Sequence, residues 1–375
     1  MSYSLATLFH ERHRFIPAIF AVAFSAMLIA LQCGLLLGLF SITSIPIDMS
    51  HADIWVGHPE IPSIDLGRPI PEDWKSYVWN EEGVERCEIF LEGFSNWVKP
   101  TGGNELALII GARLAEPDPL GAIDLLTPEH RVLLSEPGAI VVDSGEFGRL
   151  GITGIGDTAE VNGHRVRVVG TVKNLRSLAA PYLFCSVDTA RSLLPSAMAD
   201  QTTFILARCY DKSQAPEIVE RLKQKYPRKI SAFTAEAFSL HSRMHWLTKT
   251  RAGIALGLAA ALGLLVGAVV TSQTLYAATA ASMKEYAVLR ALGIPRWRVV
   301  MTVMAQSFWI GVFGVAIAMP IIFFFAGIGE NIGAKILLPW KLVVAAICVT
   351  MFMALTSGLF ALRSLRMIEP VTLLR

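Results

Sequence analysis

The apolar and polar positions of this chain are segregated into long blocks. Uncharged, mostly apolar runs cover residues 15–47, 252–283, 299–329 and 342–362, and a polar block fills most of the sequence between the first run and the second. A membrane-spanning helix needs about 20 apolar residues, so each run is long enough to cross a bilayer. The pattern predicts an integral membrane protein with four transmembrane helices and one large domain after the first of them.

The polar block mixes strand-like and helix-like patterns, which predicts a mixed α/β domain. Residues 87–98 and 106–113 are expected to pair as strands, and Asn162-Gly163 to form a tight hairpin turn, because both turn positions tolerate a positive φ. Residues 216–226 have the spacing of an amphipathic helix. Thr234 can cap a further helix that enters the second span without a breaker and would act as a rigid stalk.

These patterns divide the chain into ten consecutive segments. We expect a cytoplasmic interfacial helix at 1–14, transmembrane helices at 15–43, 252–281, 299–327 and 342–362, an extracytoplasmic α/β domain at 44–234, a stalk helix at 235–251, a cytoplasmic coupling helix and loop at 282–298, an extracytoplasmic loop at 328–341 and a cytoplasmic tail at 363–375.

The distribution of charge gives the orientation, although the net charge of +2 says little by itself. Three short segments concentrate basic residues, namely Arg12 and Arg14; Lys284, Arg290, Arg296 and Arg298; and Arg363, Arg366 and Arg375. Short loops rich in Lys and Arg stay in the cytoplasm. We therefore expect both termini and the 282–298 loop inside the cell. The first apolar run is too long for a signal peptide, so we expect it to be retained.

Candidate chemical sites are few. Gly151-x-x-Gly154-x-Gly156 superficially resembles a phosphate loop, but a turn with positive φ explains it better, and no G-x-x-x-x-G-K-(S/T) sequence occurs. His241 and His245 have i, i+4 spacing, yet Ser242 stands where a zinc hydrolase needs Glu, which favours a solvated helix face. We expect no catalytic residue, no metal site, no cofactor bound by this chain and no nucleic-acid partner.

The cysteines do not form a disulfide framework. Cys87, Cys185 and Cys209 fall in the polar block, so one disulfide at most can form there. Three isolated buried thiols are the preferred interpretation, with one bridge as the alternative.

Small and polar residues within the spans suggest close helix packing. Gly253, Gly257, Gly263 and Gly267 in the second span permit a close approach of another helix, either from the same chain or from a second copy. Gln32, Gln273 and Gln306 lie at buried depth, where such residues more often bond between helices than bind substrate.

The 282–298 loop is the best candidate site. Its first half favours a short amphipathic helix with Tyr286 and Leu289 on the apolar side, and Gly293 fits the C′ position that ends it. Two interpretations remain open from composition alone: a docking helix for a soluble partner, and an interfacial turn that carries positive-inside charges.

Short motifs in this loop and elsewhere resemble a known family. E-Y-A-V-L-R-A-L-G at 285–293 resembles the E-x-x-x-L-(K/R)-A-(L/M)-G loop of FtsX/MacB-type ABC transporter permeases, and Pro370, Leu374 and Arg375 resemble the family's closing residues. The stretch 150–170 is similar to an extracytoplasmic part of the same family. Within it, the L-x-x-E-x-x-R segment ending at Arg14 and Gln273-Thr274-Leu275-Tyr276 look closest to DevC-type permeases.

The resemblance implies a function and a set of partners. It implies a non-catalytic permease subunit in the bacterial inner membrane, present as a homodimer among membrane lipids. It also implies three partners: a separate cytoplasmic ATPase that binds ATP and Mg, a periplasmic membrane-fusion adaptor and an outer-membrane channel. The residues that would couple to the ATPase are Glu285, Tyr286, Leu289, Arg290, Ala291, Leu292 and Gly293.

We therefore expect an exporter of a lipid-like or hydrophobic substrate that works by mechanotransmission, in which ATP-driven movements of the loop are carried to the outer domain. The alternative within the same fold is a non-transport regulator that activates a periplasmic partner such as a cell-wall hydrolase. A membrane-anchored sensor or enzyme is a third class, for which the sequence offers no residues.

Overall fold

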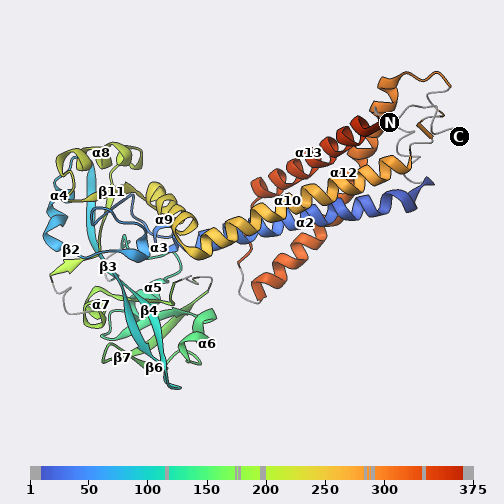
Figure 1. Ribbon diagram of the computed structural model, residues 1–375. Coiled ribbons are helices and arrows are strands. Elements are labelled where there is room, and N and C mark those ends of the chain that lie inside the picture. Colours follow the sequence, from blue (N-terminus) through green and yellow to red (C-terminus); the bar gives the residue numbers. More distant parts are fainter. Residues whose placement is uncertain are drawn as a thin grey trace. The chain divides into compact units, whose positions relative to one another are not determined.

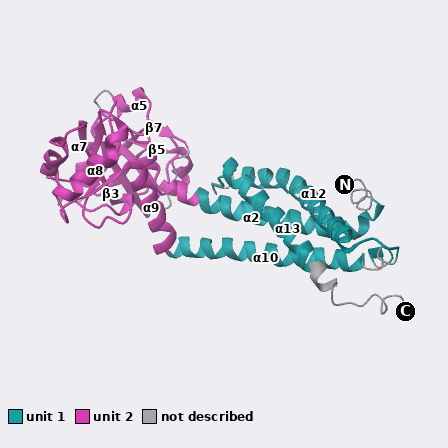
Figure 2. Cartoon of the chain, turned by 90° about the horizontal axis from the view of Figure 1, so that it is seen from above, with its two compact units in different colours: residues 1–38, 251–375 teal, residues 39–250 magenta. Residues whose placement is uncertain are grey.

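The computed structural model of the chain forms two compact units. It describes residues 10–114, 118–173, 175, 179–194, 200–282, 285–286, 288, 292–331 and 335–365. Unit 1 comprises residues 1–38 and 251–375, and unit 2 comprises residues 39–250 (Figure 2). The sequence expectation of one domain inserted between the first and second apolar runs is confirmed.

Unit 1 is built from four long helices (Figure 1). They are α2 (Arg12–Ile42), α10 (Arg251–Ala281), α12 (Arg296–Asn331) and α13 (Trp340–Leu365). Each contains a stretch long and apolar enough to cross a membrane, at mean hydropathy of 2.2 to 2.4. The four predicted spans are thus confirmed as helices. A helix satisfies its backbone hydrogen bonds internally, which is necessary where no water is present, and the apolar side chains suit the same surroundings.

Helix α2 is the central helix of unit 1. Its Phe15 and Val22 pack with Leu275 of α10, Ile310 of α12 and Ala354 of α13. In the most apolar stretch of each helix, 44% of residues are buried in α2 but only 17% in α10. Helix α10 therefore leaves most of its apolar surface to lipid or to another protein.

Unit 2 contains a nine-stranded mixed sheet of order β11-β1-β10-β3-β4-β8-β5-β7-β6. The strands are β1 (Ile54–Gly57), β3 (Val84–Val98), β4 (Asn104–Ala112), β5 (Ala139–Asp143), β6 (Thr158–Val161), β7 (His164–Val172), β8 (Tyr182–Ser186), β10 (Phe204–Cys209) and β11 (Ser231–Thr234); β2 (Ile70–Pro71) and β9 (Gln201–Thr202) form a separate pair. The predicted mixed α/β domain is confirmed.

The long strand β3 joins the two halves of this sheet. Its first half pairs with β10, and its second half pairs with β4 from Leu91 onward. Its end also pairs with β6 at Trp97 and Val98, which closes the six strands β3, β4, β8, β5, β7 and β6 around one apolar core. The predicted hairpin turn is present there, with φ of 48° at Asn162 and 82° at Gly163.

Short helices cover the sheet of unit 2. They are α3 (Ile45–Asp48), α4 (Lys75–Trp79), α5 (Pro128–Leu133), α6 (Phe147–Leu150), α7 (Val187–Leu193), α8 (Ala215–Lys225) and α9 (Ala235–Lys249). Helix α8 is the predicted amphipathic helix, and it buries Ile218, Val219 and Leu222. Cys87, Cys185 and Cys209 are buried and unbridged.

Helix α9 differs from the predicted stalk. Thr234 caps it as expected, accepting a hydrogen bond from the Ala237 amide at 3.3 Å. The expected unbroken run into the second span is wrong, because Thr250 has extended backbone angles of −94° and 147° between α9 and α10. Helix α9 instead packs within unit 2, where Phe238 is buried and Arg243 pairs with Asp48.

Candidate functional site

The loop between α10 and α12 retains the helical start predicted from the sequence. Glu285 and Tyr286 are helical, and the Tyr286 amide donates to the Ser282 carbonyl at 3.2 Å. Gly293 adopts φ of 87°, the left-handed conformation expected of a helix-ending glycine. The predicted coupling residues Leu289, Arg290 and Ala291 lie outside the residues that the structure describes.

Tyr286 anchors the loop inside unit 1. Its side chain is only 6% exposed and packs against Val299 and Val303 of α12. Its hydroxyl donates to Oε1 of Gln306 at 2.7 Å, and burial raises the pKa of this phenol to about 12. Tyr286 therefore faces inward and does not offer its ring to a soluble partner.

Large exposed apolar side chains occur on the same loop and in the first two turns of α12. They are Val288, Leu292, Trp297 and Met301, which are 51%, 74%, 63% and 62% exposed, and we call this set the loop face. Its members form two i, i+4 pairs, and the Leu292 amide donates to the Val288 carbonyl at 3.0 Å. The Arg298 guanidinium lies 5.4 Å from the centre of the Trp297 ring. The loop face thus combines large apolar side chains with a cation, as protein-binding surfaces often do.

Glu285 is held by a residue that the sequence analysis did not single out. Nη1 of Arg14, near the start of α2, lies 2.9 Å from Oε1 of Glu285 and 3.3 Å from Oγ of Ser282. Nη2 of Arg14 donates to the Ala281 carbonyl at 2.5 Å. Arg14 belongs to the L-x-x-E-x-x-R segment noted in the sequence, but local spacing gives no sign that it reaches residue 285.

Two of the four predicted packing glycines face α2 of the same chain. A Cβ atom on Gly263 would lie 1.7 Å from Oε1 of Gln32, and one on Gly267 would lie 3.2 Å from Cβ of Ser25. The Ser25 hydroxyl also bonds with the Gly267 carbonyl and Oγ1 of Thr271, each at 3.0 Å. Gly253 is buried and Gly257 half-buried on the same helix, and a role of these glycines in a dimer stays a prediction.

His241 of α9 makes contacts inside unit 2. The ring nitrogen Nε2 of His241 lies 3.0 Å from the Ile61 carbonyl, and the ring stacks on Phe233. Across the residues that the structure describes, no group of three or more His, Cys, Asp and Glu side chains has the arrangement of a metal site.

The glycine-rich turn at 151–157 is closed by its own acidic residue. The Asp157 carboxylate accepts from the Thr153 amide at 2.6 Å, the Thr153 hydroxyl at 2.9 Å and the Gly154 amide at 3.2 Å. These hydrogen bonds lower the pKa of Asp157, the largest contribution coming from the Thr153 amide. The amides that would contact a phosphate are therefore already paired.

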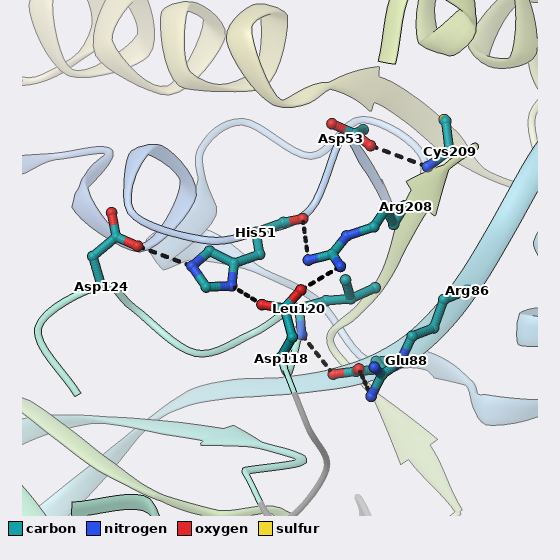
Figure 3. A network of polar contacts seen from close by, with 9 residues as sticks. All are labelled: His51, Asp53, Arg86, Glu88, Asp118, Leu120, Asp124, Arg208 and Cys209. Carbon is teal, nitrogen blue, oxygen red and sulfur yellow. Dashed lines mark hydrogen bonds and ion pairs between the residues drawn. The ribbon is translucent and has the colours of Figure 1, made fainter. Parts of the chain in front are cut away.

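A second polar network connects the start of unit 2 to the segment after β4 (Figure 3). The His51 ring lies between Asp118 and Asp124, with nitrogen–oxygen distances of 2.8 and 2.9 Å. Arg208 on β10 lies 2.5 Å from the second oxygen of Asp118, which lowers the pKa of that carboxyl. The main-chain amide of Leu120 donates to buried Glu88 at 3.0 Å. This network fixes the segment that follows α2 against the sheet.

Comparisons with known proteins match the region that contains the loop. A family model described as FtsX-like permease C-terminal matches residues 257–370. An uncharacterized ABC transporter permease of Methanocaldococcus jannaschii is 23% identical over 236 residues, which cover 59% of this chain and 57% of that protein. The match thus spans little more than half of the relative's length.

Solved extracytoplasmic domains of two transporters align with about half of this chain. The extracellular domain of the noncanonical ABC-type transporter YknZ from Gram-positive bacteria aligns over 48% of this chain and 99% of its own, at 12% identity and a TM-score of 0.34. The periplasmic region of MacB from Actinobacillus actinomycetemcomitans aligns over 52% of this chain and 94% of its own. The identity is again 12% and the TM-score again 0.34. The part of this chain at 257–370, which contains the loop, is therefore similar to the C-terminal region of FtsX-like permeases.

Proposed function

We propose that this chain is the permease subunit of an ABC exporter of the FtsX/MacB type that works by mechanotransmission. The observation that supports it most is the loop face, an exposed apolar surface on the loop of the FtsX-like region. A separate cytoplasmic ATPase would bind this surface and supply the work of ATP hydrolysis, since the sequence contains no P-loop.

The loop is built to pass on a force applied to it. Tyr286 fixes its first half to α12 through Gln306, and the other end of the loop continues directly into α12 at Arg296. A partner that pushes on Leu292 or Trp297 therefore moves two spans and not a loose connection. Closure of an ATPase dimer would reach unit 2 along α2 and α10, the helices that flank residues 39–250 in the sequence.

The proposed substrate is lipid-like or hydrophobic and does not cross a polar channel. The spans are almost free of ionisable residues, which often mark the path of a charged substrate through a membrane protein. Unit 2 would lie in the periplasm and act with a membrane-fusion adaptor and an outer-membrane channel. A second copy of the chain would cover part of the exposed apolar side of α10, which includes Leu258, Leu262 and Leu265.

Docking can be tested by placing a charge on the loop face. We expect Leu292→Asp and Trp297→Asp to weaken co-purification with a co-expressed ABC ATPase by at least about tenfold, because truncating buried aromatic and aliphatic anchors costs roughly 2 kcal/mol or more. Val132→Asp on α5, at a side chain that is 72% exposed in unit 2, is the matched control and should bind normally.

The results separate the candidate functions. Normal ATPase binding by both loop variants would overturn the docking proposal. ATPase binding with no export from proteoliposomes or cells, but with activation of a cell-wall hydrolase, would favour the regulator over the exporter.

A further inference from the structure

One arginine near the start of α2 contacts the end of α10 and the loop that follows it, two adjacent segments that are far from it in the sequence. Arg14 forms an ion pair with Glu11 one turn away, contacts Glu285 at 2.9 Å, and donates to the Ala281 carbonyl at 2.5 Å. The Arg14 guanidinium thus contacts Glu11 just before α2, the end of α10 and the loop. The Arg14 side chain is 27% exposed, so the ion pair is partly shielded from water.

The position of Arg14 matches the electrostatics of a helix end. Helix α10 ends at Ala281, and the last carbonyls of a helix have no intrahelical donor and carry a partial negative charge. A guanidinium placed there satisfies one carbonyl and opposes the helix dipole. Its planar fork can hold a carboxylate with another N–H at the same time, which a lysine ammonium does less well.

We propose that Arg14 is a positioning residue that fixes Glu285, and with it the loop, to helix α2. The proposal rests on the ATPase-docking function above and adds a role for the first helix. Glu285 then acts inside the chain, as the acceptor of Arg14, while the loop face contacts the ATPase. Movement of the loop is thereby passed to α2 as well as to α10, so both helices that flank unit 2 in the sequence respond together.

This arrangement predicts that Arg14 and Glu285 act as a pair. Arg14→Gln removes the contact with Glu285 and also the one with Ala281, so Glu285→Gln should have the smaller effect, and the double variant should be no more impaired than Arg14→Gln alone. If Glu285 contacted the ATPase directly, the loss caused by substituting Glu285 would add to the loss caused by substituting Arg14. Arg12→Gln is the matched control, because Arg12 is exposed on the same turn of α2 and loses the same charge.

The first measurement uses the full-length chain alone in lipid nanodiscs. Amide hydrogen exchange at Ser282 and Tyr286, whose amides donate to the Thr279 and Ser282 carbonyls, should be about three- to tenfold faster in Arg14→Gln and Glu285→Gln than in the wild type and Arg12→Gln. Unchanged exchange in Arg14→Gln would overturn the proposal whether or not an ATPase binds.

The second measurement uses the chain with its co-purified ATPase. The three variants should keep the affinity for the ATPase within about twofold but lose several-fold of the turnover that the complex gains over the ATPase alone, and the loss in the double variant should equal that in Arg14→Gln. If the loss in the double variant is the product of the two single losses, or if Glu285→Gln alone loses affinity for the ATPase, then Glu285 contacts the ATPase directly. Either result would overturn the positioning role. Absence of any ATPase binding by the wild type would refute the docking function, while the exchange result would still decide on Arg14.

Discussion

Glu92 on β3 is a carboxylic acid in the interior of unit 2. It is 3% exposed, and neither of its oxygens has a hydrogen-bond partner among the residues that the structure describes. Burial raises the pKa of Glu92 well above its ordinary value, and the nearby Asp65 carboxylate adds to the shift. The neutral acid is therefore the form that this site tolerates.

The stability of unit 2 should depend on pH through Glu92. The pKa of Glu92 is about 4.3 in the unfolded chain and higher in the folded one. Between these two pKa values the folded state binds more protons than the unfolded state. The folded state therefore loses stability as the pH rises from the unfolded pKa through the folded pKa. Glu92→Gln removes the ionisation and should raise the free energy of unfolding by about 1–3 kcal/mol at pH 8, with little change at pH 4. Urea unfolding of the detergent-solubilised chain, followed by tryptophan fluorescence at both pH values, measures the difference. Equal stability of the two proteins at pH 8 would contradict it.

Helix α2 approaches other backbone very closely at two glycines. Gly34 and Gly38 are spaced i, i+4, and the Gly34 carbonyl accepts from the Leu337 amide at 3.0 Å. A Cβ on Gly38 would lie 1.6 Å from the Lys335 carbonyl oxygen, a main-chain atom. The small-xxx-small spacing of α2 thus serves a contact with the segment before α13.

Two alanine substitutions should therefore differ in cost. Gly38→Ala pushes against backbone and should destabilise unit 1 by about 1–3 kcal/mol. Gly263→Ala meets the end of the flexible Gln32 side chain, which can rotate away, so its cost should be smaller. Thermal unfolding of both variants in detergent gives the comparison, and an equal or larger loss in Gly263→Ala would refute this explanation.

The elements that sequence reasoning found are those with a local signal. Apolar runs long enough for a bilayer gave α2, α10, α12 and α13, the turn Asn162-Gly163 gave the β6–β7 hairpin, and apolar spacing gave α8. The contacts of Arg14 with residue 285 and of Gly38 with residue 335 were missed, because each depends on a partner that is distant in the sequence. The break at Thr250 was missed because no glycine or proline between residues 235 and 252 marks it in the sequence.

For the molecule as a whole, the membrane orientation is the property most open to a direct test. Basic residues in the short segments predict that the 282–298 loop lies inside the cell and unit 2 outside. Exposed Lys212→Cys should therefore react with a membrane-impermeant maleimide in intact spheroplasts, whereas Arg296→Cys should react only after lysis. The parent chain, whose own cysteines in unit 2 are buried, is the control for background labelling. The opposite pattern would reverse the proposed topology.

The chain crosses between its two units at two places that differ in stiffness. Helix α2 continues through residue 38 to Ile42, whereas α9 and α10 are separated by the extended residue Thr250. An unbroken helix resists bending and twisting because successive hydrogen bonds fix its backbone, whereas the junction at Thr250 interrupts that series of hydrogen bonds. The first crossing is thus stiffer than the second. If both helices move together, we expect the larger share of a twisting motion to enter unit 2 through α2, the helix that Arg14 connects to the loop.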